Sequence, residues 1–219
     1  MAKPVFPIEV SASPKQPLGM SPAAFLRDYW QQRPLLVRQA FPHFQCPTTP
    51  DDLAGLALEE TALSRLVQYD RAHDHWQIET GPFSEDRFAT LAERDWTLLV
   101  QDVDKWDADV AALYPAFDFL PRWRFDDIMI SYAVPGGSVG AHVDNYDVFL
   151  IQGMGARNWK IDAKPNPPLA FLPDVALKLL QTFNPSHDWT LQPGDMLYLP
   201  PGVPHHGIGV TECLTISVG

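Results

Sequence analysis

This sequence is short of three things: cysteine, long apolar runs and basic residues. Its two cysteines, Cys46 and Cys213, lie far apart, which excludes the disulfide framework that holds many small secreted domains together. No apolar run approaches the roughly 20 residues of a membrane-spanning helix, and residues 1–15 lack the apolar centre of a signal peptide. We therefore expect a cytoplasmic protein that is not inserted in a membrane.

The shortage of basic residues limits the partners. The chain has 16 Lys and Arg against 27 Asp and Glu, for a formal net charge of −11. Because binding to a phosphate backbone needs Lys and Arg, we expect no direct nucleic-acid footprint. A basic protein or peptide is the favoured partner, although an acidic composition also serves solubility alone.

Short strand-like segments dominate the second half of the chain. From Trp123 onward, apolar residues alternate in short runs that Gly and Pro turns separate. This pattern predicts a mainly β protein with added helices, built on a double-stranded β-helix (jelly-roll) barrel. We expect an N-terminal arm over 1–20, helical and strand additions flanking the barrel over 21–122, and the barrel itself over 123–219.

Local signals predict individual elements. Ser21-Pro22 and Thr49-Pro50 each look like a helix start, with a capping side chain followed by proline at the first helical position. We further expect a strand over 139–144 and a short helix over 174–180.

His142 and Asp144 are the first candidate site residues. In a strand, side chains two positions apart project from the same face, about 7 Å apart along the backbone. An imidazole and a carboxylate so placed, joined by a histidine from another strand, form the two-histidine, one-carboxylate triad that holds ferrous iron and leaves coordination positions open. We assign the third ligand to His205, which prolines around a glycine turn preorganise. We expect the adjacent His206 to lie behind the ligands or in the pocket wall.

The residues that follow the pair could serve the co-substrate and the substrate. Iron oxygenases with this ligand set use a bidentate co-substrate such as 2-oxoglutarate, whose far carboxylate needs a buried cation. Arg157 and Lys160 both follow on the next strand, and they face opposite sides because they are three residues apart. The substrate entrance is expected at Asn145, Tyr146 and Asp147, with Asp147 as a partner for a guanidinium group.

Three stretches together carry a resemblance to a known family. They are DYWQQRPLLVRQAF, DDIMISYAVPGGSVGAHVDNYDVFLIQGMGARNWKI and QPGDMLYLPPGVPHHG. In this order they closely resemble the JmjC-type ribosomal oxygenases of the cupin superfamily, in particular the bacterial ribosomal-protein arginine hydroxylases. The resemblance runs from about residue 21 to residue 219.

The resemblance implies an activity and its site. It implies a dioxygenase that uses Fe(II), 2-oxoglutarate and O2 to hydroxylate an arginine side chain of a large-subunit ribosomal protein. The metal ligands would be His142, Asp144 and His205, and Arg157 would bind 2-oxoglutarate. The family usually continues into a helical dimerisation region and a winged-helix domain, so we expect a homodimer for a full-length protein and regard this chain as lacking those regions.

Two alternatives remain open from the sequence. The same iron site serves oxygenases that act on a histidine or a methylated lysine of another basic protein. A protein of a different class, a non-catalytic metal-binding cupin that binds a basic peptide, would have the same barrel. Carboxylates placed for a guanidinium group would favour arginine, and an aromatic cage would favour methylated lysine.

Overall fold

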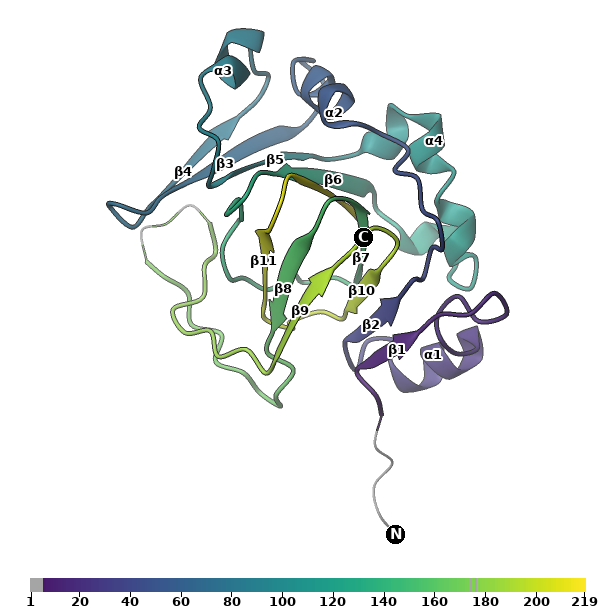
Figure 1. Cartoon of the computed structure of the whole chain (residues 1–219). Coiled ribbons are helices and arrows are strands. Elements are labelled where there is room, and N and C mark those ends of the chain that lie inside the picture. Colours follow the sequence, from purple (N-terminus) through teal and green to yellow (C-terminus); the bar gives the residue numbers. More distant parts are fainter. Residues whose placement is uncertain (1–5, 174, 176) are drawn as a thin grey trace.

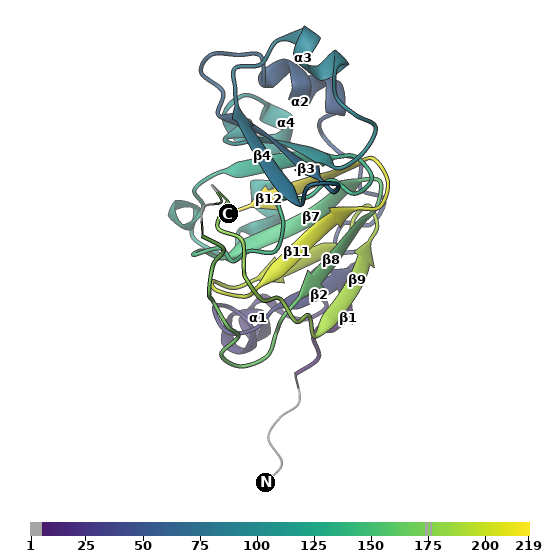
Figure 2. The ribbon, with the colours of Figure 1, turned by 90° about the vertical axis from the view of Figure 1, so that its left-hand side faces the viewer.

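Two facing β-sheets form the centre of this protein. The structure is a computed structural model, and it describes residues 6–173, 175 and 177–219. Within these residues, nine strands form a large sheet and three form a small one. The large sheet curves around the small sheet (Figure 1), and a view turned by 90° shows strands of both sheets running across the barrel (Figure 2). The expected double-stranded β-helix is confirmed.

The described strands and helices alternate in the first half, and strands dominate the second. The strands are β1 (Glu9–Ser11), β2 (Leu35–Arg38), β3 (Ser64–Asp70), β4 (His75–Thr80), β5 (Trp96–Val100), β6 (Ile128–Ala133), β7 (Val148–Met154), β8 (Arg157–Ile161), β9 (His187–Leu191), β10 (Met196–Leu199), β11 (His205–Gly209) and β12 (Cys213–Val218). The helices are α1 (Pro22–Asp28), α2 (Pro50–Leu56), α3 (Glu85–Ala89) and α4 (Ala108–Ala111), with 3-10 turns η1 (Val103–Lys105), η2 (Tyr114–Phe117) and η3 (Arg122–Arg124).

The N-terminal half extends the large sheet at both edges. The strand order is β1-β2-β10-β7-β12-β6-β5-β3-β4 in the large sheet and β11-β8-β9 in the small one. Strand β2 pairs with β10 and carries β1 as a parallel neighbour, while β5, β3 and β4 continue the sheet beyond β6. The segments before the barrel are therefore part of its wall.

Strands β7 and β10 separate two apolar cores. Their side chains alternate between the two faces of the large sheet, because successive residues of a strand point in opposite directions. Phe149 and Tyr198 join the larger core outside the barrel, whereas Leu150 and Leu197 join the smaller core between the sheets. Burial on both faces explains why these strands are apolar at nearly every position.

The helices begin where the sequence predicts. The Ser21 hydroxyl accepts a hydrogen bond from the Ala24 N–H at 3.2 Å, and Thr49 forms a reciprocal capping box with Asp52. Helices α1 and α2 each have seven residues. Among the described residues, no helix has the length and apolar character needed to cross a membrane.

The expected strand over 139–144 is wrong. This segment is a loop in which His142 alone pairs, through an isolated bridge to His205. The loop turns at Gly140, whose φ of +79° lies in the left-handed region, and the Gly140 N–H donates to the Ser138 hydroxyl at 3.0 Å. A strand cannot continue through that conformation.

The expected helix over 174–180 is also wrong for residues 177–180. Residues 174 and 176 lie outside the described part of the chain, and the described residues 177–180 are not helical. Leu180 instead forms a bridge to Phe171, and its N–H donates to the Ala141 carbonyl at 2.9 Å. Long-range pairing has overridden the local helical signal.

We expect Asp195, which lies outside the cavity, to contribute strongly to the stability of the fold. The residue is 2% exposed, and its carboxylate accepts hydrogen bonds from Arg38 Nη1 at 2.8 Å and from the Gln39 and Gln192 N–H groups. We expect Asp195→Ala to lower the free energy of unfolding by about 3 kcal/mol, because removal of the carboxylate leaves buried donors unpaired. Urea unfolding monitored by circular dichroism measures this change.

The matched control is Asp188→Ala on strand β9. Asp188 has a half-exposed side chain and lies 3.8 Å from Lys160, and exposed ion pairs contribute less than about 1 kcal/mol. Equal effects of the two substitutions would contradict the role given to Asp195.

Candidate metal centre

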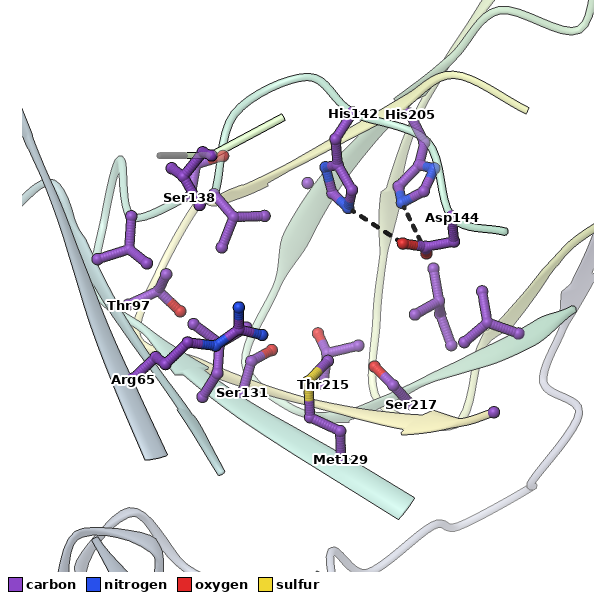
Figure 3. Close-up of a pocket in the computed structure, with 18 of the residues that line it drawn as sticks. Arg65, Thr97, Met129, Ser131, Ser138, His142, Asp144, His205, Thr215 and Ser217 are labelled. Carbon is purple, nitrogen blue, oxygen red and sulfur yellow. Dashed lines mark ion pairs between the residues drawn. The ribbon is translucent and has the colours of Figure 1, made fainter. Parts of the chain in front are cut away.

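Three side chains from two segments, the loop after β6 and the start of β11, converge at one end of the cavity between the sheets. The His142 and His205 Nε2 atoms lie 3.8 and 3.5 Å from the two carboxylate oxygens of Asp144. The candidate ligand atoms of the three residues all lie within 4.8 Å of one another. Figure 3 shows both imidazoles and the carboxylate directed toward one point. The structure thus brings together the three residues proposed from the sequence.

A backbone bridge holds the two histidines side by side. The His142 N–H donates to the His205 carbonyl at 3.0 Å, and the His205 N–H donates to the His142 carbonyl at 2.9 Å. The ring centroids are 4.2 Å apart. The position of His142 therefore depends on β11 as well as on its own loop.

Each histidine presents the same nitrogen to the centre. Nδ1 of His142 lies 3.0 Å from the Gly140 carbonyl, and Nδ1 of His205 lies 2.9 Å from the Val203 carbonyl. A carbonyl only accepts, so each Nδ1 carries the proton and donates. This tautomer leaves both Nε2 lone pairs free for a metal.

Burial favours the neutral forms of the side chains at this centre. Burial lowers the pKa of His205 well below its ordinary value, and the neighbouring His142 lowers it further. Burial also raises the pKa of the Asp144 carboxyl, an effect that His142 partly offsets. A neutral imidazole is the form that binds a metal.

The donor set fits a divalent transition metal. Ligand atoms that lie 2.0–2.2 Å from a metal are about 3–4 Å from one another, and the observed separations of 3.5 and 3.8 Å fall within this span. Two imidazole nitrogens and one carboxylate are the ligands of facial-triad Fe(II) sites. His142, Asp144 and His205 would hold the ion.

The centre opens into a cavity of about 400 Å³. The triad lies on one side of the cavity, and Ser131, Thr215 and Ser217 line the opposite side from strands β6 and β12 (Figure 3). Val148 and Leu150 add apolar walls from β7. The cavity is large enough for a small co-substrate together with one side chain of a protein substrate.

Arg157 and Lys160 face opposite sides of β8, as their spacing predicts. Arg157 is 6% exposed and lines the cavity, where its Nη1 donates to the Ser131 hydroxyl at 2.9 Å. Its Nε and Nη2 atoms find no acceptor among the described residues. Lys160 points away from the cavity toward Asp188. Arg157 is therefore the residue of the two that can meet an anionic ligand.

The three residues after Asp144 do not all line the cavity of the metal centre. Tyr146 lines the cavity, and burial, together with the nearby Asp144 and Asp127 carboxylates, raises the pKa of its hydroxyl to about 12. Asn145 and Asp147 line an adjoining hollow instead. Asp147 accepts hydrogen bonds from the Tyr198 hydroxyl and from Gln31 Nε2, so it already has protein partners.

Sequence reasoning missed Asp127, whose carboxyl lines the cavity near Tyr146. Only one hydrogen bond to it is found among the described residues, from the Asp102 N–H at 3.0 Å. Burial raises the pKa of Asp127, and the negative charges of Asp102, Asp126 and Asp104 raise it further. The sequence does carry a signal for this position. Residues 127, 129 and 131 are two apart and all line the cavity, as expected for one face of a strand.

The described lining carries charges of both signs. Besides the triad, the charged side chains of the wall are Arg65, Asp127, Arg157 and Lys178. Figure 3 shows the Arg65 guanidinium directed into the cavity, on the side away from Asp144. One cavity thus offers cations for an anionic ligand and a carboxylate for a cationic one.

Comparison with known proteins finds a family model and similar curated proteins. A family model described as the JmjC domain matches residues 112–219. The ribosomal protein uL16 3-hydroxylase of Escherichia coli K12 is 44% identical over 195 residues, which cover 89% of this chain and 51% of that protein. A probable ribosomal oxygenase of Haemophilus influenzae is 39% identical, covering 93% of this chain and 50% of that protein.

A solved structure shows what a relative binds. The structure of YcfD, described as a ribosomal oxygenase from Escherichia coli in complex with cobalt and 2-oxoglutarate, matches with a TM-score of 0.81 at 43% identity. The match covers 92% of this chain and 52% of that one. The chain spans about half the length of the relatives it matches.

His205 and His206 provide a direct test of the metal centre. We expect His205→Ala to weaken Co²⁺ binding by about 100-fold or more, because the change removes a ligand, whereas loss of a group that merely orients a ligand costs 10–100-fold. His206→Ala should leave the affinity within about threefold, because His206 does not belong to the triad. Isothermal titration of Co²⁺ into metal-free protein measures both, and equal weakening would contradict the assignment.

Proposed function

From the premise that this chain belongs to the JmjC-domain family of ribosomal oxygenases, we propose that it is a 2-oxoglutarate- and Fe(II)-dependent oxygenase that hydroxylates an arginine side chain of a large-subunit ribosomal protein. The observation that carries the proposal is the pairing, in one cavity, of a two-histidine, one-carboxylate triad with a buried, incompletely paired arginine. A barrel that only binds peptides needs neither feature.

The metal site and Arg157 suit the two ends of 2-oxoglutarate. His142, Asp144 and His205 would hold an ion from one side, which would leave its cavity side for the keto acid end. Arg157 offers two donor atoms, Nε and Nη2, that have no acceptor in the described part of the chain, and this pair matches the geometry of the far carboxylate. Ser131 fixes the guanidinium through Nη1 and so orients these donors.

When bound, Fe(II) and 2-oxoglutarate would supply O2 activation, in which one oxygen atom enters a substrate C–H bond as hydroxyl and the other enters succinate as CO2 is released. The protein contributes binding and orientation to this chemistry. Val148 and Leu150 form apolar walls that limit the access of water to the centre. The ordered imidazoles keep Nε2 directed at the ion.

The cavity wall favours arginine over methylated lysine. Apart from the triad, Asp127 is the carboxylate found in the described lining, and it has no cationic partner among the described residues. Tyr146 and Trp159 are the aromatic residues of that lining, apart from the triad histidines, and two rings do not make a cage. A guanidinium group that entered beside Tyr146 could donate to the Asp127 carboxylate.

The acidic character of the chain suits the same substrate. With a net charge of −11, the protein should attract a basic ribosomal protein electrostatically. We propose uL16 as the first substrate to test, because the Escherichia coli relative is named for it.

The central experiment is a hydroxylation assay. Protein reconstituted with Fe(II) and 2-oxoglutarate under anaerobic conditions is mixed with arginine-containing uL16 peptides, O2 is admitted, and the peptides are analysed by mass spectrometry. We expect the mass of one oxygen atom to be added to an arginine, and no addition with His142→Ala. Succinate without peptide oxidation would contradict the proposed substrate, and no succinate with any peptide would contradict the oxygenase.

A matched pair of substitutions tests Asp127. We expect Asp127→Asn to raise the KM for an arginine peptide by about 10-fold or more, because a charge-assisted hydrogen bond is lost, with the KM for 2-oxoglutarate unchanged. Asp126→Asn, at the exposed neighbouring position, should change neither constant by more than about twofold. Equal effects of the two substitutions would contradict the role of Asp127.

The same variant should be at least as stable as the wild type at neutral pH. The raised pKa of Asp127 means that the folded protein binds this proton more tightly than the unfolded chain does, so the ionised carboxylate destabilises the fold at pH 7. The advantage of Asp127→Asn should shrink as the pH falls through the raised pKa of the folded state, and it should vanish below the ordinary pKa of about 3.9, where the carboxyl is protonated in both states. Urea unfolding at several pH values measures this difference, and a variant less stable at pH 7 would contradict it.

A further inference from the structure

The small sheet places three inward-facing residues in a row that runs from beside the metal centre to the arginine. Arg157, Trp159 and Ile161 alternate inward along β8, and all three are buried. Across the strand pair, Arg157 lies opposite Gly209, Trp159 opposite Gly207 and Ile161 opposite the triad residue His205. The Trp159 indole is thus the middle residue of this row.

A ligand that reaches from the metal to Arg157 must pass the indole. Four residues of strand separate the position opposite His205 from Arg157, a distance of about 13 Å along the backbone. The Trp159 ring centroid is 5.9 Å from the His205 ring, and the Arg157 Cζ is 5.9 Å from the Trp159 ring centroid. A five-carbon dicarboxylic acid held at both ends would lie against this ring.

The indole N–H is a buried donor without a partner. Trp159 lines the cavity and is 5% exposed, yet its Nε1 finds no acceptor among the described residues. The same holds for Nε and Nη2 of Arg157, on the same face of the same strand. Buried polar groups are nearly always paired, and leaving them unpaired costs free energy. Three unpaired donors along one wall indicate an anionic ligand that completes them together.

Gly207 makes room for the ring. A Cβ atom at this position would lie 2.7–2.9 Å from three carbons of the six-membered ring of Trp159, closer than such contacts allow. The indole is therefore packed directly against the β11 backbone, and its position is fixed by the absence of a side chain at Gly207.

We propose that Trp159 is a positioning residue for the co-substrate: its indole N–H donates a hydrogen bond to a carboxylate oxygen of bound 2-oxoglutarate, and Gly207 holds the ring in place for that contact. The inference rests on the proposed function. In this arrangement, one wall of the cavity binds the whole length of the co-substrate. Arg157 holds one end, and the Trp159 indole contacts the co-substrate between that end and the metal.

Nuclear magnetic resonance reports the contact directly. The chain has seven tryptophans, and Trp159→Phe identifies the indole signal of Trp159 as the one that is lost. With 15N-labelled protein loaded with diamagnetic Zn²⁺, we expect that signal to move downfield when 2-oxoglutarate is added. The other indole signals should move less.

Affinity provides the second readout. Titration calorimetry of 2-oxoglutarate into the Zn²⁺-loaded protein should give a Kd about 10-fold higher for Trp159→Phe, which retains an aromatic ring but removes the donor. Gly207→Ala should raise the Kd by a similar factor because it displaces the ring. Trp189→Phe is the matched control, since Trp189 lies opposite Trp159 on β9, and its Kd should stay within about twofold of the wild type.

The outcomes separate this inference from the proposed function. If 2-oxoglutarate binds the wild type but the Trp159 signal stays in place and Trp159→Phe retains full affinity, the indole contact is wrong and the oxygenase proposal stands. If the Zn²⁺-loaded wild type does not bind 2-oxoglutarate, both are wrong. Equal weakening by Trp189→Phe would show a general effect of strand packing and would also overturn the contact.

Discussion

The reciprocal pair of backbone hydrogen bonds between His142 and His205 is the constraint on which the candidate site depends. It joins a loop after β6 to the first residue of β11, two segments far apart in the chain. Because each histidine also donates from Nδ1 to a carbonyl two residues before it, the backbone fixes both ring positions and both tautomers. Asp144 then needs only to approach two nitrogens that are already in place.

The rest of the barrel supports this pair by supplying rigid walls. Strands β7 and β10 are buried on both faces, so the large sheet is packed between two cores and cannot shift without disturbing both. That rigidity allows the cavity to keep costly features, among them incompletely paired donors on Arg157 and a carboxylate at Asp127 that burial and like charges destabilise. Such features persist in a stable fold when a ligand uses them.

The charged side chains of the cavity would bind the two proposed ligands at different places. An anionic co-substrate would meet Arg157 on the wall of the small sheet, while a cationic side chain would meet Asp127 beside Tyr146. Both would have to converge on the triad, which lies across the cavity from Ser131 (Figure 3). Opposite charges in one cavity would thus give each proposed ligand its own route to the candidate metal centre.

The sequence by itself determined the features that depend on spacing and local chemistry: the jelly-roll barrel, the capped helix starts, and the placement of Arg157 and Lys160 on opposite sides of their strand. Side-chain periodicity and capping are properties of neighbouring residues, so they can be read from the chain. Only the tertiary structure decided the rest. It made the His142 segment a loop, paired Leu180 with Phe171 where a helix was expected, turned Arg157 rather than Lys160 toward the cavity, and bonded Asp147 to Tyr198. These outcomes depend on partners that are distant in sequence, and spacing carries no information about them.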